Sequence, residues 1–188
     1  MPGSVWAWSA DEFEAAGADP KARGARADEF LAALKKIRTE DPVEFHGKYF
    51  TVPRSIIGAK PVQKPHPPIY LAAYAPAALK RAATLANGWM PVGIPLDAMA
   101  AMIAQLRQMA KDAGRDPQSL AVVVGANLSL RPALLGADRA IFTGSLDQVK
   151  SDIDAVKKLG VSEIFFMIFT DGSIEDLIAA MKRFRSLV

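Results

Sequence analysis

The sequence predicts an α/β fold with parallel strands, and three observations predict it. From Ile69 onward, short apolar runs alternate with longer segments of helical periodicity. Within the runs, apolar and polar residues do not alternate, which is typical of strands buried on both faces of a sheet. Turn residues such as Asn87-Gly88 separate a helix from the next run. Because strands that alternate with helices pair in parallel through crossovers, we expect a parallel sheet covered by helices.

Four apolar runs are the expected strands, and a helix follows each of them. The runs are residues 69–73, 89–92, 120–128 and 163–169. The helices begin near Pro76, which suits a first helical turn, near Met99, at Ser145, where Ser145-Leu146-Asp147-Gln148 forms a capping motif, and at Ser173. Val5-Trp6-Ala7 is expected to be the stub of a further strand. An eight-stranded barrel needs about 250 residues, so these strands cannot close one by themselves.

The first part of the chain is predicted to be helical and then irregular. Ser9-Ala10-Asp11-Glu12 has the spacing of a capping box and predicts a short helix to about Ala16. Apolar residues at three- and four-residue spacing predict an amphipathic helix over about residues 20–38. Residues 40–68 are rich in proline, which excludes helix, and contain a small predicted hairpin at residues 45–50. Loops this long usually cover something, so 40–68 is either a lid or a surface insertion without a role.

Composition excludes several classes of function. The chain has 188 residues with a net charge of +3, and its acidic and basic residues are interleaved, so we expect one domain over 1–188 that binds neither nucleic acid nor a membrane. No apolar run is long enough to span a bilayer, and residues 1–9 do not resemble a signal peptide, so we expect a cytoplasmic protein. With no cysteine and only two histidines, no metal site is expected.

Five segments together resemble the luciferase-like monooxygenase family, most closely its branch that uses the deazaflavin coenzyme F420. They are Phe45–Phe50, Lys60–Ile69, Ala78–Ala83, Asn87–Pro91 and Ala113–Pro117, and their order and spacing agree with the family. The resemblance implies a partial (β/α)8 TIM barrel that runs from the end of strand 4 to helix 8. The N-terminal half of the family's barrel would precede Met1.

A cofactor phosphate is best bound by backbone amides at the start of a helix. The resemblance places the phosphate at the turn formed by Ala72, Ala73, Tyr74 and Ala75, and at the end of the next strand, at Val92-Gly93. Small side chains in the first turn would let a phosphate approach, and a helix is predicted to begin directly afterwards. The alternative is that these small residues only allow a strand and a helix to pack closely.

Other residues have weaker claims to the site. Trp89 and Met90 come at the expected carboxyl end of a strand and either wall the ring and substrate pocket or belong to the core. The resemblance places Trp8 and Glu12 near the cofactor, although Glu12 can also simply cap its helix. His46 and His66 have no partner motif, so no catalytic residue is assigned.

The resemblance implies an F420-dependent oxidoreductase that transfers a hydride between the deazaflavin and a small organic substrate. One alternative is an FMN-dependent monooxygenase of the same fold, since the residues that would contact the ring belong mostly to the family's first strands. Another is a catalytically inactive half-barrel that dimerises. Because an open sheet leaves two unpaired edges and an exposed apolar face, we expect a homodimer or a larger homo-oligomer.

Overall fold

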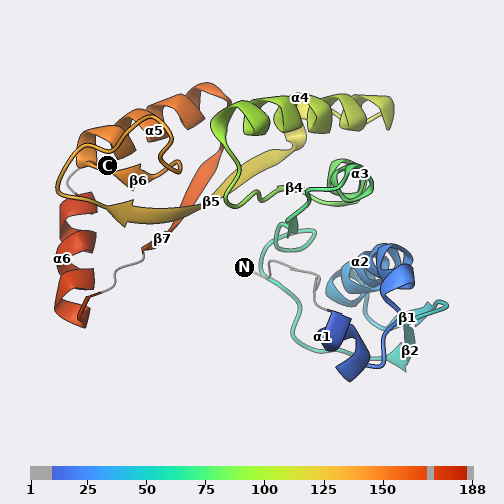
Figure 1. Cartoon of the computed structure of the whole chain (residues 1–188). Helices are drawn as coiled ribbons and strands as arrows, with labels where there is room; N and C mark the ends of the chain where they lie inside the picture. The colour runs from blue at the N-terminus through green and yellow to red at the C-terminus, as the bar shows by residue number, and fades with distance from the viewer. Residues whose placement is uncertain (1–9, 169–171, 186–188) are drawn as a thin grey trace. The chain divides into compact units, whose positions relative to one another are not determined.

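The computed structural model describes residues 10–168 and 172–185, and the chain divides into two compact units, Met1–Ile69 and Tyr70–Val188. Figure 1 shows both units and labels most of their helices and strands. Several residues of the sequence-based expectations lie outside the described residues, namely Trp8, Ser9 and the strand stub Val5-Trp6-Ala7. Within the described ranges, no helix is long and apolar enough to cross a membrane.

The first unit consists of helices and one small hairpin. Its elements are α1 (Ala10–Ala15), a 3-10 turn (Pro20–Ala22), α2 (Arg23–Thr39), β1 (Val43–His46) and β2 (Thr51–Ser55). The strands β1 and β2 pair antiparallel, with His46 opposite Thr51. Leu31 on α2 and Val43 on β1 are both buried. The unit is therefore held by apolar contact between its long helix and the hairpin.

A single carboxylate on α2 holds the tip of the hairpin. Glu29 accepts hydrogen bonds from the backbone N–H groups of Lys48 (2.9 Å), Tyr49 (2.7 Å) and Phe50 (2.7 Å). A Cβ atom on Gly47 would lie 2.1 Å from a carboxylate oxygen of Glu29, so only glycine fits there without a shift. The Phe50 ring also packs on the ring of Phe30 at 5.8 Å. The segment Phe45–Phe50 thus docks a hairpin onto a helix.

Ionisation of Glu29 should therefore control the hairpin tip. Burial opposes its charge, but the three backbone N–H groups and the nearby Arg26 outweigh burial and lower the pKa of Glu29 below its ordinary value. A carboxyl whose pKa is lowered by folding stabilises the fold at neutral pH, and that stabilisation is lost as the pH falls through the lowered pKa. We expect the amide protons of Tyr49 and Phe50 to lose protection from hydrogen exchange as the pH falls through this lowered pKa.

The substitution Glu29→Gln should remove the same protection already at pH 7, because an amide accepts these hydrogen bonds more weakly than a carboxylate. Glu40→Gln is the matched control, since Glu40 is an exposed residue just past the end of the same helix. Amide exchange followed by NMR between pH 3 and 7 measures both effects. Unchanged protection in Glu29→Gln would show that the carboxylate does not hold the tip.

The second unit is a parallel sheet with helices, which confirms the predicted α/β class. Its strands are β3 (Tyr70–Leu71), β4 (Gly88–Trp89), β5 (Ala121–Leu130), β6 (Thr143–Gly144) and β7 (Glu163–Ile168). Its helices are α3 (Pro76–Leu85), α4 (Leu96–Asp112), a 3-10 turn (Pro117–Ser119), α5 (Leu146–Lys158) and α6 (Ile174–Arg185). The strands β3, β4 and β5 pair in that order, β6 and β7 each pair with β5, and every pair is parallel. The described strands form an open sheet, as expected of a partial barrel.

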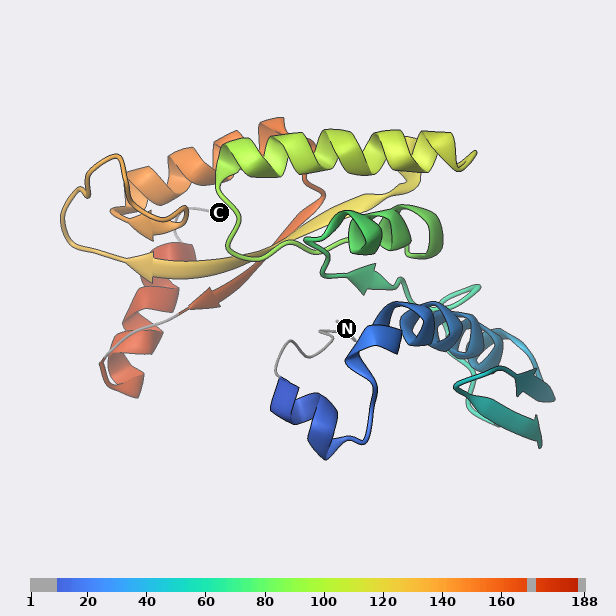
Figure 2. The ribbon, with the colours of Figure 1, turned by 45° about the vertical axis from the view of Figure 1, so that its right-hand side comes forward.

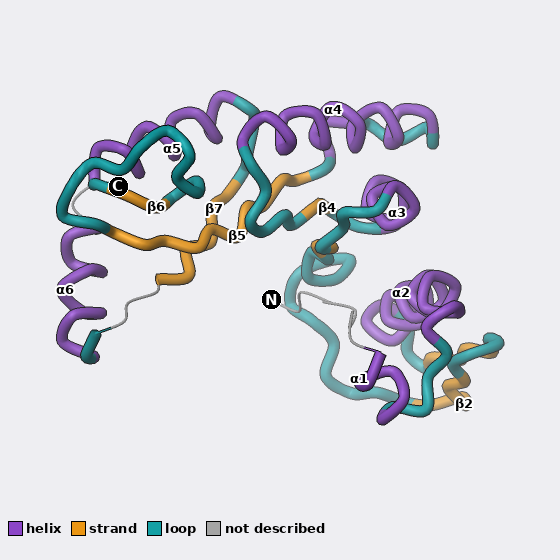
Figure 3. The backbone as a smooth tube through the Cα atoms, in the orientation of Figure 1, coloured by secondary structure: helices purple, strands orange, loops and turns teal. Residues whose placement is uncertain are grey.

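The strand β5 is the centre of this sheet. On one side it pairs with β7 over the six residues Val123–Leu128. On the other side its backbone N–H groups donate first to Pro91 (from Gly125, 2.8 Å) and later to Phe142 (from Ser129, 3.1 Å). The short strand β6, which the sequence analysis did not predict, therefore continues the line of β4 along β5, as the tube in Figure 3 shows.

Helices cover one face of β5. Figure 2 shows α4 and α5 along the same side of this strand. Val124 and Leu128 of β5 are buried, and Phe166 of the neighbouring β7, which is in register with Ala126, contacts the ring of Phe142 on the helix side. On the opposite face Phe165 is 54% exposed. The open sheet therefore keeps one covered face and one face that is partly accessible.

Candidate cofactor site at the strand ends

The carboxyl ends of β3 and β4 lie next to each other, as the sequence predicted for Ala73 and Val92. The two strands pair in parallel, with Leu71 opposite Trp89. Beyond them, the hydroxyl of Tyr74 donates to the Val92 carbonyl oxygen at 3.2 Å and lies 3.3 Å from the Val92 backbone nitrogen, which donates to it. One side chain thus joins the turn after β3 to the turn after β4.

The start of α3 offers backbone amides to an anion. Ala75 is the N-cap residue, with φ −73° and ψ 147°, and its methyl side chain cannot cap the helix. Pro76 follows and has no N–H group, so the first amides that point out of the helix belong to Ala77 and Ala78. Ala75 is exposed, while Ala72 is half-buried and Ala73 is buried. Small residues leave these amides uncovered, which is the condition for a phosphate site.

Trp89 lies in the core beneath this turn. Its side chain is fully buried, and its indole N–H donates to the carbonyl oxygen of Ala73 at 2.8 Å. Met90 follows it and is half-buried, with its backbone N–H on the Leu71 carbonyl oxygen at 2.9 Å. Trp89 therefore fixes the backbone at the end of β3, directly before the exposed residues Tyr74 and Ala75.

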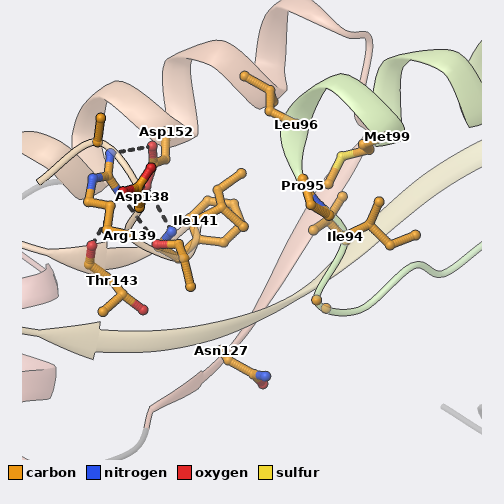
Figure 4. Close-up of a pocket in the computed structure, with 16 residues that line it drawn as sticks. Ile94, Pro95, Leu96, Met99, Asn127, Asp138, Arg139, Ile141, Thr143 and Asp152 are labelled. Atoms are coloured by element: carbon orange, nitrogen blue, oxygen red, sulfur yellow. Dashed lines mark hydrogen bonds and ion pairs between the residues drawn. The ribbon is translucent and has the colours of Figure 1, made fainter.

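A cavity of about 450 Å³ lies next to the turn after β4, where Gly93 is one of its lining residues. Figure 4 shows its two walls: the turn after β4 with the start of α4, including Ile94, Leu96 and Met99, and a loop before β6 that includes Arg139 and Ile141. Gly93, one of the predicted cofactor residues, lines it, with φ +66°. Its volume is that of a ligand pocket, and its walls are mostly apolar.

A salt bridge holds the loop side of the cavity. The guanidinium of Arg139 donates to both carboxylate oxygens of Asp152 on α5, at 2.6 and 2.8 Å, and also to the Thr143 carbonyl oxygen at 3.1 Å. The two side chains are only 16% and 14% exposed. These hydrogen bonds raise the pKa of Arg139 above its ordinary value, although partial burial opposes its charge. Arg139 therefore keeps its charge, and the pair ties the loop to α5.

Asp152 also fixes an unusual backbone conformation. It accepts a hydrogen bond from the N–H of Phe142 at 2.8 Å, and Phe142 has φ +61°, a left-handed conformation that is strained for a bulky residue. The ring of Phe142 is buried and meets Phe166 edge-on at 5.6 Å. Ring burial and the Asp152 hydrogen bond together offset this strain. This wall could not be predicted from the sequence, because an irregular stretch carries no periodic signal.

The remaining candidates lie in the first unit. Glu12 is exposed on α1. His46 is exposed, and its Nε2 lies 2.8 Å from a carboxylate oxygen of Glu44, while Nδ1 of His66 lies 2.8 Å from the carbonyl oxygen of Pro67. Among the described residues, no three histidine or acidic side chains gather as a metal site would require. No arrangement here assigns a general acid or base.

A family model described as luciferase-like monooxygenase matches residues 3–134, which is more than half of the chain. The chain belongs to the luciferase-like monooxygenase family. The match contains every residue of the predicted cofactor site, from Ala72 to Gly93, and ends inside the loop that walls the cavity. The sequence-based recognition of this family is thereby confirmed.

Relatives by sequence agree with this family. An uncharacterized protein of Mycobacterium tuberculosis is 33% identical over 105 residues, which are 56% of this chain and 35% of that protein. An FMNH(2)-dependent dimethylsulfone monooxygenase of Pseudomonas putida is 30% identical over 126 residues, 65% of this chain and 33% of that protein. The chain therefore spans about a third of the length of these curated relatives.

Solved structures share the fold. The monooxygenase RslO1 from Streptomyces bottropensis has a TM-score of 0.79 at 21% identity, over 97% of this chain and 65% of that one. An F420-dependent secondary alcohol dehydrogenase, solved with an F420-acetone adduct, has a TM-score of 0.71 at 16% identity, over 83% of this chain and 60% of that one. Luciferase-like neighbours of this chain thus include both F420-dependent enzymes and monooxygenases.

Proposed function

We propose that the chain contributes the phosphate-binding part of an F420-dependent oxidoreductase, in which a hydride passes between the deazaflavin and a small organic substrate. The observation that carries the proposal is the junction at Tyr74, which holds the carboxyl ends of β3 and β4 together beside the uncapped start of α3. In open parallel sheets, ligands bind outside the carboxyl ends of the strands. When bound, the deazaflavin supplies the redox chemistry, and the chain supplies binding and orientation.

The residues of this chain fit an anionic group at that junction. The amides of Ala77 and Ala78 and the positive end of the α3 dipole would contact a phosphate, and Ala75 leaves them uncovered. Trp89 would help to position the turn that leads to these amides, because its indole N–H donates to the Ala73 carbonyl oxygen. Gly93 would let the backbone after β4 approach the same group, because it carries no side chain and already has φ +66°.

The alternative cofactor is FMN, and the FMNH(2)-dependent relative in Pseudomonas putida favours it. Both cofactors carry a phosphate, so the amides at the start of α3 serve either one. The apolar cavity beside Gly93 is the candidate space for the organic substrate, because it has the volume of a ligand pocket and adjoins the proposed cofactor residues. The lid role of residues 40–68, the inactive half-barrel and the cytoplasmic location stay predictions.

Cofactor titration with charged and neutral variants of Ala75 tests the proposal. Purified chain is titrated with F420 and, separately, with FMN, while quenching of cofactor fluorescence is followed. Ala75→Asp places a carboxylate on the α3 amides and should weaken binding by about tenfold, because it repels phosphate. Ala75→Asn is the matched control, with the same shape and no charge, and should weaken binding less. Aspartate is a favourable N-cap, so loss of binding cannot be attributed to unfolding.

Two results would contradict the proposal. The absence of quenching by either cofactor up to about 50 µM, far above the dissociation constant that a resident cofactor requires, would favour an inactive half-barrel. Equal affinities of the aspartate and asparagine variants would show that the phosphate binds elsewhere. Tighter binding of FMN than of F420 would replace the deazaflavin by the flavin in the proposal and leave the site unchanged.

We also propose that the chain assembles as a homo-oligomer. Among the described strands, β3, β6 and β7 each have one partner strand, so each leaves one edge unpaired. Exposed strand edges and the partly exposed face around Phe165 favour association.

A further inference from the structure

The last helix, α6, carries an exposed apolar stripe. Ile174, Ile178 and Met181 are 67%, 46% and 52% exposed. Their spacing of four and three residues places them on one side of the helix, because a helix turns once in 3.6 residues. An adjacent side is already used, since the ring of Phe184 packs on Phe166 of β7 at 4.5 Å. The stripe is thus a second apolar surface on a helix that is already docked.

Opposite charges flank this stripe at its two ends. Glu175 in the first turn follows Ile174, and Lys182 in the last turn follows Met181. One residue corresponds to a rotation of about 100° around a helix, so both charges lie on the same flank of the stripe. The helix dipole alone explains an acidic first turn and a basic last turn. It does not explain why Glu175 and Lys182 both lie beside the apolar stripe.

We propose that a second copy of the chain docks on this stripe, with the two α6 helices antiparallel about a two-fold axis near Ile178. In that arrangement Glu175 of each copy faces Lys182 of the other, so the charge pair forms twice. The apolar side chains of the two stripes cover one another between these pairs. A surface with an acidic end, an apolar middle and a basic end is complementary to itself only when two copies run antiparallel, which is the requirement for an isologous dimer.

This interface specifies the surface for the proposed homo-oligomer and rests on that part of the proposed function. Its position suits an open sheet, because α6 packs on β7 through Phe184, and β7 is an end strand. Docking at α6 would bring a second copy to the same end of the sheet. An apolar surface alone could accept many partners, but the arrangement of Glu175 and Lys182 selects another α6.

The mass of the chain in solution, measured by size-exclusion chromatography with light scattering, tests the interface. The wild-type chain should have twice the mass of one copy. Ile178→Asp should raise the dissociation constant by at least about tenfold, because it places two carboxylates at the axis. Leu134→Asp is the matched control, since Leu134 is 75% exposed on a loop of the same unit and should leave the mass unchanged.

Charge reversal separates docking from a mere effect on folding. Glu175→Lys alone and Lys182→Glu alone should each weaken the dimer, since each places like charges opposite one another. The double variant Glu175→Lys/Lys182→Glu should restore it, because the pairs re-form with exchanged signs. Both positions are exposed, and circular dichroism monitors the folded state of every variant. A double variant as weak as the single ones would overturn the antiparallel arrangement.

The wild-type result distinguishes this inference from the broader proposal. A wild-type monomer would overturn both the α6 interface and the proposed oligomer. An oligomer whose mass does not respond to Ile178→Asp would overturn the α6 interface alone and leave the strand edges as the contact. Neither result bears on cofactor binding, which the Ala75 variants test separately.

Discussion

Replacement of Trp89 by alanine is expected to lower the free energy of unfolding by about 3–5 kcal/mol. Trp89 is the largest of the fully buried side chains, so its removal leaves a cavity between β4 and its neighbours. The substitution also leaves the Ala73 carbonyl without its indole donor at 2.8 Å. Chemical denaturation followed by circular dichroism measures the change. Since Ala73 belongs to the proposed phosphate turn, cofactor affinity should fall with stability.

Trp89→Phe is the companion variant. Phenylalanine retains most of the apolar volume but cannot donate to Ala73, so the loss should be smaller, about 1–3 kcal/mol. The comparison decides between the two interpretations of Trp89 that the sequence left open. A Trp89→Ala chain of normal stability that had lost only cofactor binding would make Trp89 a wall of the cofactor pocket and not a core residue.

Replacement of Asp152 by alanine should cost about 2–4 kcal/mol. It removes both hydrogen bonds to Arg139 and the one that holds Phe142 in its left-handed conformation, and it leaves a guanidinium only 16% exposed without its carboxylate. The loop that walls the cavity should then lose its fixed conformation. Thermal unfolding measures the loss of stability, and the amide proton of Phe142 should lose protection from hydrogen exchange.

Asp154→Ala is the control for this experiment, since Asp154 lies two residues further along α5 and is exposed. It should change stability by no more than about 0.5 kcal/mol. A double variant in which both Arg139 and Asp152 become alanine should be less destabilised than the sum of the single variants, because each single variant leaves a charge unpaired. Strict additivity would mean that the two groups do not act as a pair.

Much of the second unit could be predicted from the sequence because its signal is apolar periodicity. The run from Ile69 predicted a five-residue strand, but β3 covers only Tyr70–Leu71. Ile69 and Ala73 at the ends of the run are nevertheless buried. An apolar run records burial in the core, whereas a strand also needs a neighbour for its backbone hydrogen bonds, and that neighbour is set by other parts of the chain.

The contacts that position the cavity wall and the hairpin could not be predicted in this way. Arg139 and Asp152 are 13 residues apart, and Glu29 lies about 20 residues from the amides that it binds. Each pair is formed by charged residues of common types, so neither leaves a pattern in the sequence. The left-handed conformation of Phe142 is similar, since a bulky aromatic residue gives no local sign of it. The proximity of Ala73 and Val92 was predictable because it follows from parallel pairing alone.

The ten-residue strand β5 hydrogen-bonds to three others, namely β4, β6 and β7. Pairing with one common strand joins these strands into one cooperative element, because β6 and β7 pair with no other described strand, and β4 keeps only its short pairing with β3 once β5 separates. The second unit should consequently unfold in a single transition. A destabilising change at either end of β5 should also lower the stability of the other end. The proposed cofactor turn adjoins that strand at Gly125 and the cavity wall adjoins it at Ser129, so the two would be lost together.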